Sequence, residues 1–390
     1  MSFIKGILIL LCLLLFEYSS SAQSIEDLSF GTDSTFEVMT WNIEWLPKNG
    51  QTTIDYLVEI IEALDVDLLA IQEVDNIDVF EQMIESLDAY DGYLESSYFA
   101  GLAYIYKPGT IQINDIYEIY TTSPYWSPFP RSPMVMDIDF MNERFIIINN
   151  HFKCCGNGIL NSSNPDDEET RRYTASNLLK DYIDINFPNE KTIVLGDLND
   201  ILSDDTENNV FQMFLDDSEN YLFADYEIAH GNESNWSYPS WPSHIDHILI
   251  TNELFDLFES WGSVIQTIKI DEYLTGGWSE YDQNVSDHRP VALKLSMDSS
   301  VGVADFAAAS MHFTNYPNPF NSETTFSFVI PDEPAVLEIV NVQGQMVYSE
   351  KLPPGKTTIK WNANGLPQGI YFARLRGNMG DLATLKLMIR

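Results

Sequence analysis

Lys191-Thr-Ile-Val-Leu-Gly-Asp-Leu-Asn-Asp200 is a run of β-forming residues that stops at a glycine and continues with Asp197 and Asn199 at alternate positions. Residues two apart in an extended chain point to the same side, so a buried strand ending here would present a carboxylate and a carboxamide together. Taken alone, the segment is better explained as a polar turn, since Gly, Asp and Asn are common turn residues. Other segments of the same design favour a functional site.

Four further parts of the chain place an acid, an amide or an imidazole at the end of an apolar run. They are Thr40 to Trp45, Leu68 to Glu73, Phe145 to His151, and Ile245 to His247 together with Ser286 to Pro290. Helical stripes lie between these strands, at Thr52 to Leu64 with Thr52 as the N-cap, at Val79 to Leu87, and at Tyr173 to Ile183. The alternation predicts an α/β fold, a sandwich of two packed sheets flanked by helices. The order of elements between Asp200 and Trp241 does not follow from the sequence.

In order and spacing, the five segments resemble the endonuclease/exonuclease/phosphatase family, which includes deoxyribonuclease I, the abasic-site endonucleases and the neutral sphingomyelinases. The resemblance covers about Phe36 to Met297, and we place the catalytic domain at residues 31–297. It implies the two-sheet α/β sandwich of deoxyribonuclease I and metal-dependent hydrolysis of phosphate esters.

The resemblance implies a metal site. Glu73 would be the main ligand, Asn42 would help to position metal or phosphate, and Asp287 would complete the metal or water network. Hard oxygen ligands suit Mg²⁺ or Mn²⁺, with Ca²⁺ a further candidate, whereas zinc would want more His or Cys. Arg131 resembles the arginine that contacts the substrate phosphate in this family.

The resemblance also assigns catalytic roles. Asp197 would orient or deprotonate the attacking water, and Asn199 would hold a phosphoryl oxygen. His151 would donate to the phosphate in the transition state, and Asp246 would pair with His288 to fix its tautomer. We expect His244 and His247 to have structural roles and to take no part in catalysis.

One departure from deoxyribonuclease I concerns the first histidine, which a glutamate steadies in that enzyme. The matching position here, near Ala100, is not acidic. Either Glu95 substitutes for the glutamate or His151 acts without that partner.

The ends of the chain predict export. Residues 1–22 fit a cleaved signal peptide, with Lys5 before an apolar core that is too short to span a membrane comfortably. Residues 298–312 are small and polar enough to be a linker. Residues 313–390 resemble the C-terminal sorting domain of the type IX secretion system, through Asn315 to Asn321, Val342 to Gly344 and Gly369 to Phe372. We therefore expect a small all-β sandwich domain, the type IX machinery as a partner, no stable membrane insertion, a monomer, and a secreted or surface location.

The net charge of −39 is concentrated in the catalytic region. From Met311 onward there are six Asp and Glu against seven Lys and Arg, so the preceding chain carries about −40. Such acidity indicates a heavily solvated surface and argues against tight nonspecific binding to DNA, which needs a basic footprint. The adjacent Cys154 and Cys155 are expected to form a vicinal disulfide outside the cell, with free thiols or an intermolecular bridge as the alternatives.

These features predict a secreted phosphodiesterase that acts as a nuclease on DNA or RNA. The alternatives are a sphingomyelinase-type enzyme or a phosphomonoesterase of the same fold, and a catalytically inactive surface adhesin. The sequence has no evident amphipathic stretch for docking to a membrane, which argues against a lipid substrate. None of the main site residues is missing, which argues against an inactive adhesin. Trp236, Tyr238 and Trp241 could stack on a base or sugar, although covering the edge of the core is the commoner role of such residues.

Overall fold

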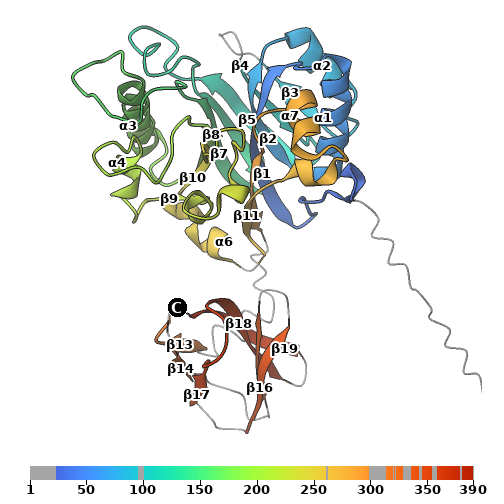
Figure 1. The fold of residues 1–390 in the computed structure, drawn as a ribbon, viewed down its shortest axis with the longest axis vertical. Helices are drawn as coiled ribbons and strands as arrows, with labels where there is room; N and C mark the ends of the chain where they lie inside the picture. The colour runs from blue at the N-terminus through green and yellow to red at the C-terminus, as the bar shows by residue number, and fades with distance from the viewer. Residues whose placement is uncertain are drawn as a thin grey trace, which may run out of the picture. The chain divides into compact units, whose positions relative to one another are not determined.

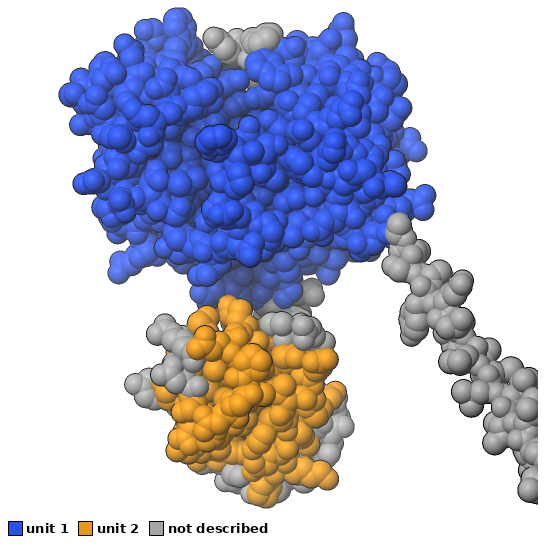
Figure 2. Space-filling view, viewed as in Figure 1, with its two compact units in different colours: residues 1–297 blue, residues 298–390 orange. Residues whose placement is uncertain are grey.

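The computed structural model describes residues 23–94, 101–260 and 262–297, and in the C-terminal part residues 313–318, 320, 322–327, 335–341, 345–353, 358–377 and 380–389. The chain divides into two compact units, Met1–Met297 and Asp298–Arg390 (Figure 2). The predicted signal peptide, the predicted linker and Glu95 lie outside the described residues.

The first unit contains two six-stranded sheets that pack face to face (Figure 1). In chain order, the strands of the first sheet are β1 (Thr35–Leu46), β2 (Leu68–Val74), β3 (Asp91–Tyr93), β4 (Gly101–Tyr106), β11 (Val264–Thr267) and β12 (Val291–Ser296). They are arranged β11-β12-β1-β2-β4-β3, and β1 and β2 run parallel.

The second sheet is arranged β5-β6-β7-β8-β10-β9, and its central strands β7 and β8 are also parallel. Its strands are β5 (Ile111–Glu118), β6 (Met134–Phe140), β7 (Glu143–His151), β8 (Lys191–Asp197), β9 (Tyr221–Phe223) and β10 (Asp246–Thr251). Because side chains alternate along a strand, Phe36 and Val38 of β1 face the second sheet, while Met39 and Trp41 face the helices.

Helices cover the outer face of each sheet. α1 (Gln51–Leu64), α2 (Ile77–Glu85) and α7 (Gly277–Asn284) pack on the first sheet, and α3 (Glu168–Asn186) and α4 (Gln212–Leu215) pack on the second (Figure 1). The short helices α5 (Tyr226–Ala229) and α6 (Phe255–Glu259) complete the unit. The predicted two-sheet α/β sandwich is confirmed.

Two details of the predicted helices are wrong. α1 begins at Gln51 with Gly50 as its N-cap, and Thr52 lies inside the first turn. α2 begins and ends two residues earlier than predicted, because the side chain of Asn76 accepts a hydrogen bond from the Val79 N–H and starts the helix there. Gly50 makes no side-chain cap hydrogen bond, whereas the start of α2 depends on the direction of the Asn76 side chain.

The second unit is built from two antiparallel sheets around a core that includes Phe326, Leu337 and Trp361. One sheet has the order β13-β14-β17 and the other β16-β15-β18-β19. The strands are β13 (Thr314–Tyr316), β14 (Glu323–Ser327), β15 (Ala335–Asn341), β16 (Met346–Leu352), β17 (Thr358–Asn362), β18 (Gly369–Gly377) and β19 (Gly380–Ile389). The all-β character is confirmed, although Val342 to Gly344 lie outside the described residues. None of the described helices has the length and apolar character needed to cross a membrane.

Candidate active site

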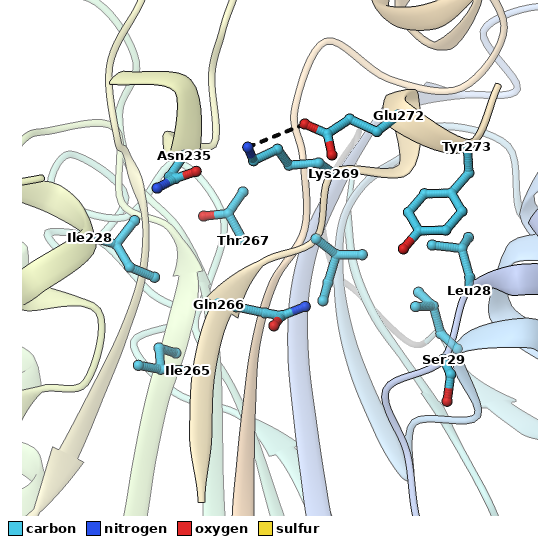
Figure 3. A pocket seen from close by; sticks show the side chains of 12 residues that line it. Leu28, Ser29, Ile228, Asn235, Ile265, Gln266, Thr267, Lys269, Glu272 and Tyr273 are labelled. Carbon is cyan, nitrogen blue, oxygen red and sulfur yellow. Dashed lines mark ion pairs between the residues drawn. The ribbon is translucent and has the colours of Figure 1, made fainter. Parts of the chain in front are cut away.

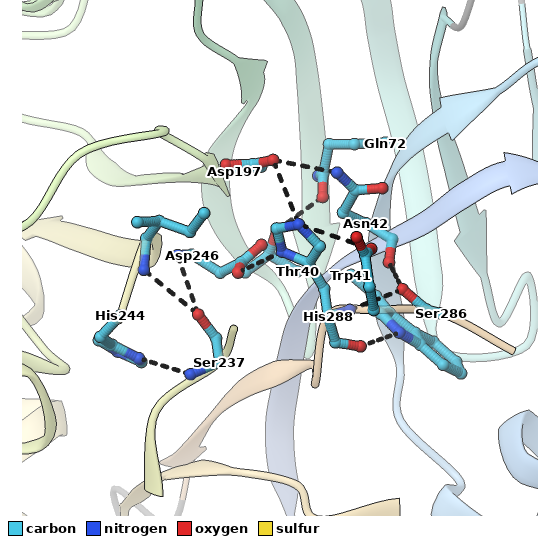
Figure 4. Close-up of polar contacts among 12 residues, drawn as sticks. Thr40, Trp41, Asn42, Gln72, Asp197, Ser237, His244, Asp246, Ser286 and His288 are labelled. Atoms are coloured by element: carbon cyan, nitrogen blue, oxygen red, sulfur yellow. Dashed lines mark hydrogen bonds and ion pairs between the residues drawn. The ribbon is translucent and has the colours of Figure 1, made fainter. Parts of the chain in front are cut away.

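The polar residues predicted at strand ends meet at one edge of the two sheets (Figure 4). In the second sheet, Asp197 of β8 is paired in register with His151 of β7 on one side and with Asp246 of β10 on the other. Gly196 permits this close packing, because a Cβ there would lie 2.0 Å from the carbonyl oxygen of Asn150. Its φ of +152° is also rarely adopted by other residues.

Asp197 lies at the centre of the cluster and is almost fully buried. Its Oδ2 accepts a hydrogen bond from Nδ2 of Asn42 at 3.0 Å and lies 3.4 Å from Nε2 of His151. Burial raises the pKa of Asp197 to about 7, and the negative charges of Asp246 and Glu73 act in the same direction against the opposing effects of His288 and Asn42. This carboxyl group is therefore poised to exchange a proton near neutral pH.

His288 forms a buried ion pair with Asp246, as the sequence predicts for this position. Its Nδ1 lies 2.8 Å from Oδ2 of Asp246, and its Nε2 lies 3.9 Å from Oδ2 of Asp197. Burial opposes the charged imidazolium, but Asp246 and Asp197 outweigh it and raise the pKa of His288 to about 10. The imidazole therefore carries a proton at neutral pH.

The backbone around His288 is held by several hydrogen bonds. The hydroxyl of Tyr281 donates to the His288 carbonyl at 2.6 Å, and Nε1 of Trp41 donates to the same oxygen at 3.3 Å. Oγ of Ser286 accepts from the His288 N–H and donates to the carbonyl of Asn42. These bonds tie the segment that carries His288 to β1.

His151 is the opposite case, because no described carboxylate lies as close to it as Asp246 lies to His288. Burial, reinforced by the positive charge of Arg131, holds the pKa of His151 well below its usual range, so its ring is neutral. Its Nε2 also lies 3.8 Å from Oε1 of Glu73, and no hydrogen-bond partner reaches its buried Nδ1 among the residues that the structure describes.

Two carboxylates that the sequence predicts as metal ligands lie near the two imidazoles: Oε1 of Glu73 is 3.8 Å from Nε2 of His151, and Oδ1 of Asp287 is 3.8 Å from Nε2 of His288. Glu73 and Asp287 are partly exposed, and the Asp287 N–H donates to Oε2 of Glu44 at 2.8 Å. Burial raises the pKa of Glu44 to about 7, and the charge of Asp287 contributes to the increase while Lys48 opposes it. An oxygen-rich set in which carboxylates crowd together fits a hard divalent cation, whose charge would offset their repulsion.

A second cluster that could hold a metal consists of Asp197, Asp246 and His288. Two of its donor atoms, Oδ2 of Asp246 and Nδ1 of His288, are already bonded to each other. The metal site predicted at Glu73, Asp287 and Asn42 stays a prediction.

Two further predicted residues lie at the border of this cluster, and the Asn199 N–H donates to Oδ1 of Asp197 at 3.1 Å. Asn199 adopts a left-handed conformation with φ +54°, and its Nδ2 donates to the Phe152 carbonyl at 3.3 Å. It does not extend β8, so the expectation of an Asp and an Asn side by side on a strand is wrong. Arg131 lies in the segment before β6, close enough to His151 to affect its pKa.

His244 and His247 both bond Asp225 rather than the catalytic residues. Nε2 of His244 and Nδ1 of His247 lie 3.1 and 2.6 Å from the same carboxylate oxygen, and all three side chains are buried. This arrangement agrees with the structural role expected from the sequence.

Three residues outside the predicted catalytic and metal sets also shape the site. Nε2 of Gln72 donates to Oδ1 of Asn149 at 2.8 Å, which joins the two sheets below the catalytic edge. The ring of Tyr238 lies 4.8 Å from that of His288, so this residue does not simply cover the edge of the core. Asn149 and Asn150, which precede His151, could have indicated the contact with Gln72 from the sequence, since amides at the end of an apolar strand need hydrogen-bond partners when buried.

Two other features lie outside the catalytic cluster. A cavity of about 390 Å³ is lined by residues such as Leu28, Thr267 and Tyr273, and none of the predicted site residues lines it (Figure 3). Cys154 and Cys155 are free thiols in this structure, which is one of the alternatives that the sequence leaves open.

The protein has a deoxyribonuclease I-like fold and is a metal-dependent phosphoric-ester hydrolase. The model of the Endonuclease/Exonuclease/phosphatase family matches residues 39–288, and the chain belongs to that family. Residues 314–390 match the Secretion system C-terminal sorting domain, which indicates export to the cell surface or the exterior. None of the curated proteins matches the chain.

Solved structures show the same fold at low sequence identity. TDP2 from D. rerio, complexed with a single-strand DNA product, is 13% identical with a TM-score of 0.51, and the match covers 67% of this chain and 99% of that one. The catalytic domain of human Nocturnin is 15% identical over 67% and 94% of the two chains, with a TM-score of 0.48. At 13% identity the likeness to TDP2 supports the fold alone.

Proposed function

We propose that this protein is an extracellular nuclease that hydrolyses phosphodiester bonds of DNA or RNA with Mg²⁺ or Mn²⁺. The proposal rests on one observation: two buried imidazoles, His151 and His288, place their Nε2 atoms 3.4 and 3.9 Å from the same oxygen of Asp197. A carboxylate between two imidazoles can handle the proton of an attacking water and the charge of a poor alkoxide leaving group within one site.

Each side chain has a defined task in this mechanism. Asp197 orients the water and accepts its proton, and its pKa of about 7 suits that exchange. Asn42 fixes the direction of the carboxylate through its hydrogen bond. His288, held as an imidazolium by Asp246, donates to the charge that develops on the phosphoryl group, and neutral His151 and Arg131 support the same group from the other side. A divalent cation at Glu73 and Asp287 would neutralise charge on the phosphoryl and leaving oxygens.

The proposal of nucleic acid as the substrate rests on the resemblance to deoxyribonuclease I in the order and spacing of the five segments, and D. rerio TDP2, which has a similar fold, was solved with a single-strand DNA product. The charge of the catalytic region favours a second candidate. A region that carries about −40 repels a polyanion at long range, so a small phosphomonoester or a phospholipid with a neutral headgroup, such as sphingomyelin, would meet less repulsion.

Initial rates of the purified protein on DNA, RNA, sphingomyelin and a sugar phosphate decide between these candidates, each measured with Mg²⁺ and with a chelator. Activity on DNA or RNA that is lost with the chelator supports the nuclease. A NaCl series at fixed saturating Mg²⁺ adds a second criterion, because salt screens the repulsion and shortens the Debye length to about 10 Å near 0.1 M. We expect kcat/KM on nucleic acid to hold steady or rise at moderate salt, and activity confined to sphingomyelin or the sugar phosphate would refute the nuclease.

A further inference from the structure

The loop that follows His151 is fastened to α3 by two buried side chains. Oε1 of Glu169 accepts hydrogen bonds from the backbone N–H groups of Asn157 at 2.7 Å and Gly158 at 2.5 Å. Nη1 of Arg172 donates to the carbonyl oxygens of Lys153 and Cys155, both at 2.7 Å. The backbone on both sides of Cys154 is therefore held from within the protein.

The same loop is bonded to the turn that carries Asp197. The Phe152 N–H donates to the Asp197 carbonyl at 2.9 Å, and the Phe152 carbonyl accepts from Nδ2 of Asn199. Nε of Arg172 donates to Oδ2 of Asp200 at 2.8 Å. Arg172 thus connects the Cys155 carbonyl directly to the segment after the central catalytic carboxylate.

At the tip of this loop, Cys154 and Cys155 expose two thiols whose Sγ atoms lie 2.9 Å apart. Nζ of Lys153 lies 3.5 Å from Sγ of Cys154, so a thiolate attacking from Cys154 would have a cation beside it. The thiols face solvent, are next to each other and belong to a protein with an export domain. Disulfides persist in such oxidising surroundings.

We propose that Cys154 and Cys155 form a covalent modification site, which small disulfide compounds oxidise reversibly to a vicinal disulfide that slows hydrolysis. The thiolate of Cys154 attacks a disulfide R–S–S–R and releases one R–S⁻, which leaves Cys154 joined to the second R–S group. The thiolate of Cys155 then attacks Sγ of Cys154 and releases that group. Two thiols lose two electrons and two protons, and one R–S–S–R becomes two R–SH.

Closing this bond must move the backbone. Ordinary disulfides join Cα atoms roughly 4.4–6.8 Å apart with sulfurs at about 2.05 Å, whereas adjacent Cα atoms across a trans peptide are about 3.8 Å apart. Closing the ring would twist the peptide between Cys154 and Cys155, and the flanking carbonyls of Lys153 and Cys155, which Arg172 holds, would turn with it. Arg172 would then no longer hold Asp200 and the loop in the same position. A misplacement of about 1 Å can cost a hundredfold in rate, so we expect hydrolysis to slow by roughly tenfold.

Mass spectrometry of the full-length protein, treated with oxidised glutathione and then alkylated, tests the modification itself. The tryptic fragment Cys154 to Arg171 contains both cysteines and should lose the mass of two hydrogen atoms, and dithiothreitol should restore it. Cys154→Ser should yield a glutathione adduct on Cys155 instead. If the wild-type fragment carries only glutathione adducts or intermolecular bridges, the proposal is overturned.

Two readouts test the link to the site. Amide hydrogen exchange at Asp197 to Asp200 should quicken on oxidation, and hydrolysis of bis(4-nitrophenyl) phosphate with Mg²⁺ should slow reversibly. The double variant Cys154→Ser/Cys155→Ser should be active and insensitive to oxidant. Only the hydrolysis readout rests on the proposed function, so an inactive reduced protein would refute that function while mass and exchange still decide the redox site. An internal disulfide that leaves exchange and rate unchanged would refute the link.

Discussion

Nδ2 of Asn42 donates a hydrogen bond to Oδ2 of Asp197 across 3.0 Å, and the two residues belong to different sheets. Asn42 lies in β1 and Asp197 ends β8, so this bond joins the two halves of the sandwich at the catalytic edge. The amide also sets the direction of the carboxylate oxygen that faces both imidazoles. The site therefore depends on the packing of the two sheets as much as on the identity of its residues.

Asp197→Asn should reduce kcat by more than tenfold, which corresponds to more than about 1.4 kcal/mol. The amide keeps the size of the side chain but cannot accept the proton of the attacking water. Steady-state rates and a thermal melt measure activity and folding separately, and the exposed Asp205→Asn serves as the matched control. A smaller loss of kcat would remove Asp197 from its assigned role.

His288 and Asp246 should behave as one unit in a double-mutant cycle, because their side chains are bonded at 2.8 Å. We expect His288→Gln to slow hydrolysis by about a hundredfold, within the usual range for an acid or base catalyst, and Asp246→Asn to be milder. The double variant should be no slower than His288→Gln. The exposed His230→Gln is the control, and additive losses would show that the two residues act separately.

Glu73→Gln should weaken metal binding rather than the chemical step. Mutation of a residue that only hydrogen-bonds to a metal ligand typically changes metal affinity by about tenfold or more. For the ligand itself, the Mg²⁺ concentration that gives half-maximal rate should therefore rise by at least about tenfold. Much of the rate should return at high Mg²⁺. Glu81→Gln, an exposed change on α2, is the control. An unchanged Mg²⁺ requirement would exclude Glu73 as a ligand.

The metal-free protein should lose stability as the pH rises. The pKa values of Asp197 and Glu44 are raised to about 7 and that of His288 to about 10, above their ordinary values of 3.8, 4.5 and 6.5. Between each ordinary pKa value and the raised one, the folded state binds more protons than the unfolded state. The free energy of unfolding therefore falls as the pH rises through each of these intervals. The lowered pKa of His151 opposes this trend below its ordinary value of 6.5.

Thermal melts with a chelator across a pH series measure this dependence. Asp197→Asn should flatten the part of the curve below pH 7, where that group titrates. Mg²⁺ should recover stability most at high pH, where the ligands are ionised. A melting temperature that climbs steadily from acidic to alkaline pH without metal would contradict the assignment of these groups.

A protein that ends at Met297 should melt and hydrolyse substrate like the full chain, because the two compact units have separate cores. Deleting residues 313–390 in the producing cell should instead prevent export, since that region contains the match to the sorting domain. Melting curves and the activity of culture fractions measure the two effects. Loss of folding after the truncation would show that the catalytic unit extends beyond Met297.

The amino-acid sequence determined the fold class and most of the candidate site, because both depend on local patterns. Apolar runs of β-forming residues bordered by an acid, amide or imidazole are readable without tertiary contacts, and five such segments in order indicate strand ends that meet at one edge. Residue chemistry likewise pointed to Asp197, His288 and Glu73, since oxygen donors and imidazoles suit metal-assisted hydrolysis.

The tertiary structure decided what those patterns leave open. The turn after β8 gives Asn199 a left-handed backbone and aims its amide at Phe152, whereas an extended chain would have placed it beside Asp197. Tyr238 reaches His288 through a segment that shows no regular pattern in the sequence. Proton affinities also follow from burial and neighbouring charge, which is why one imidazole is neutral and the other charged although the two side chains are chemically identical.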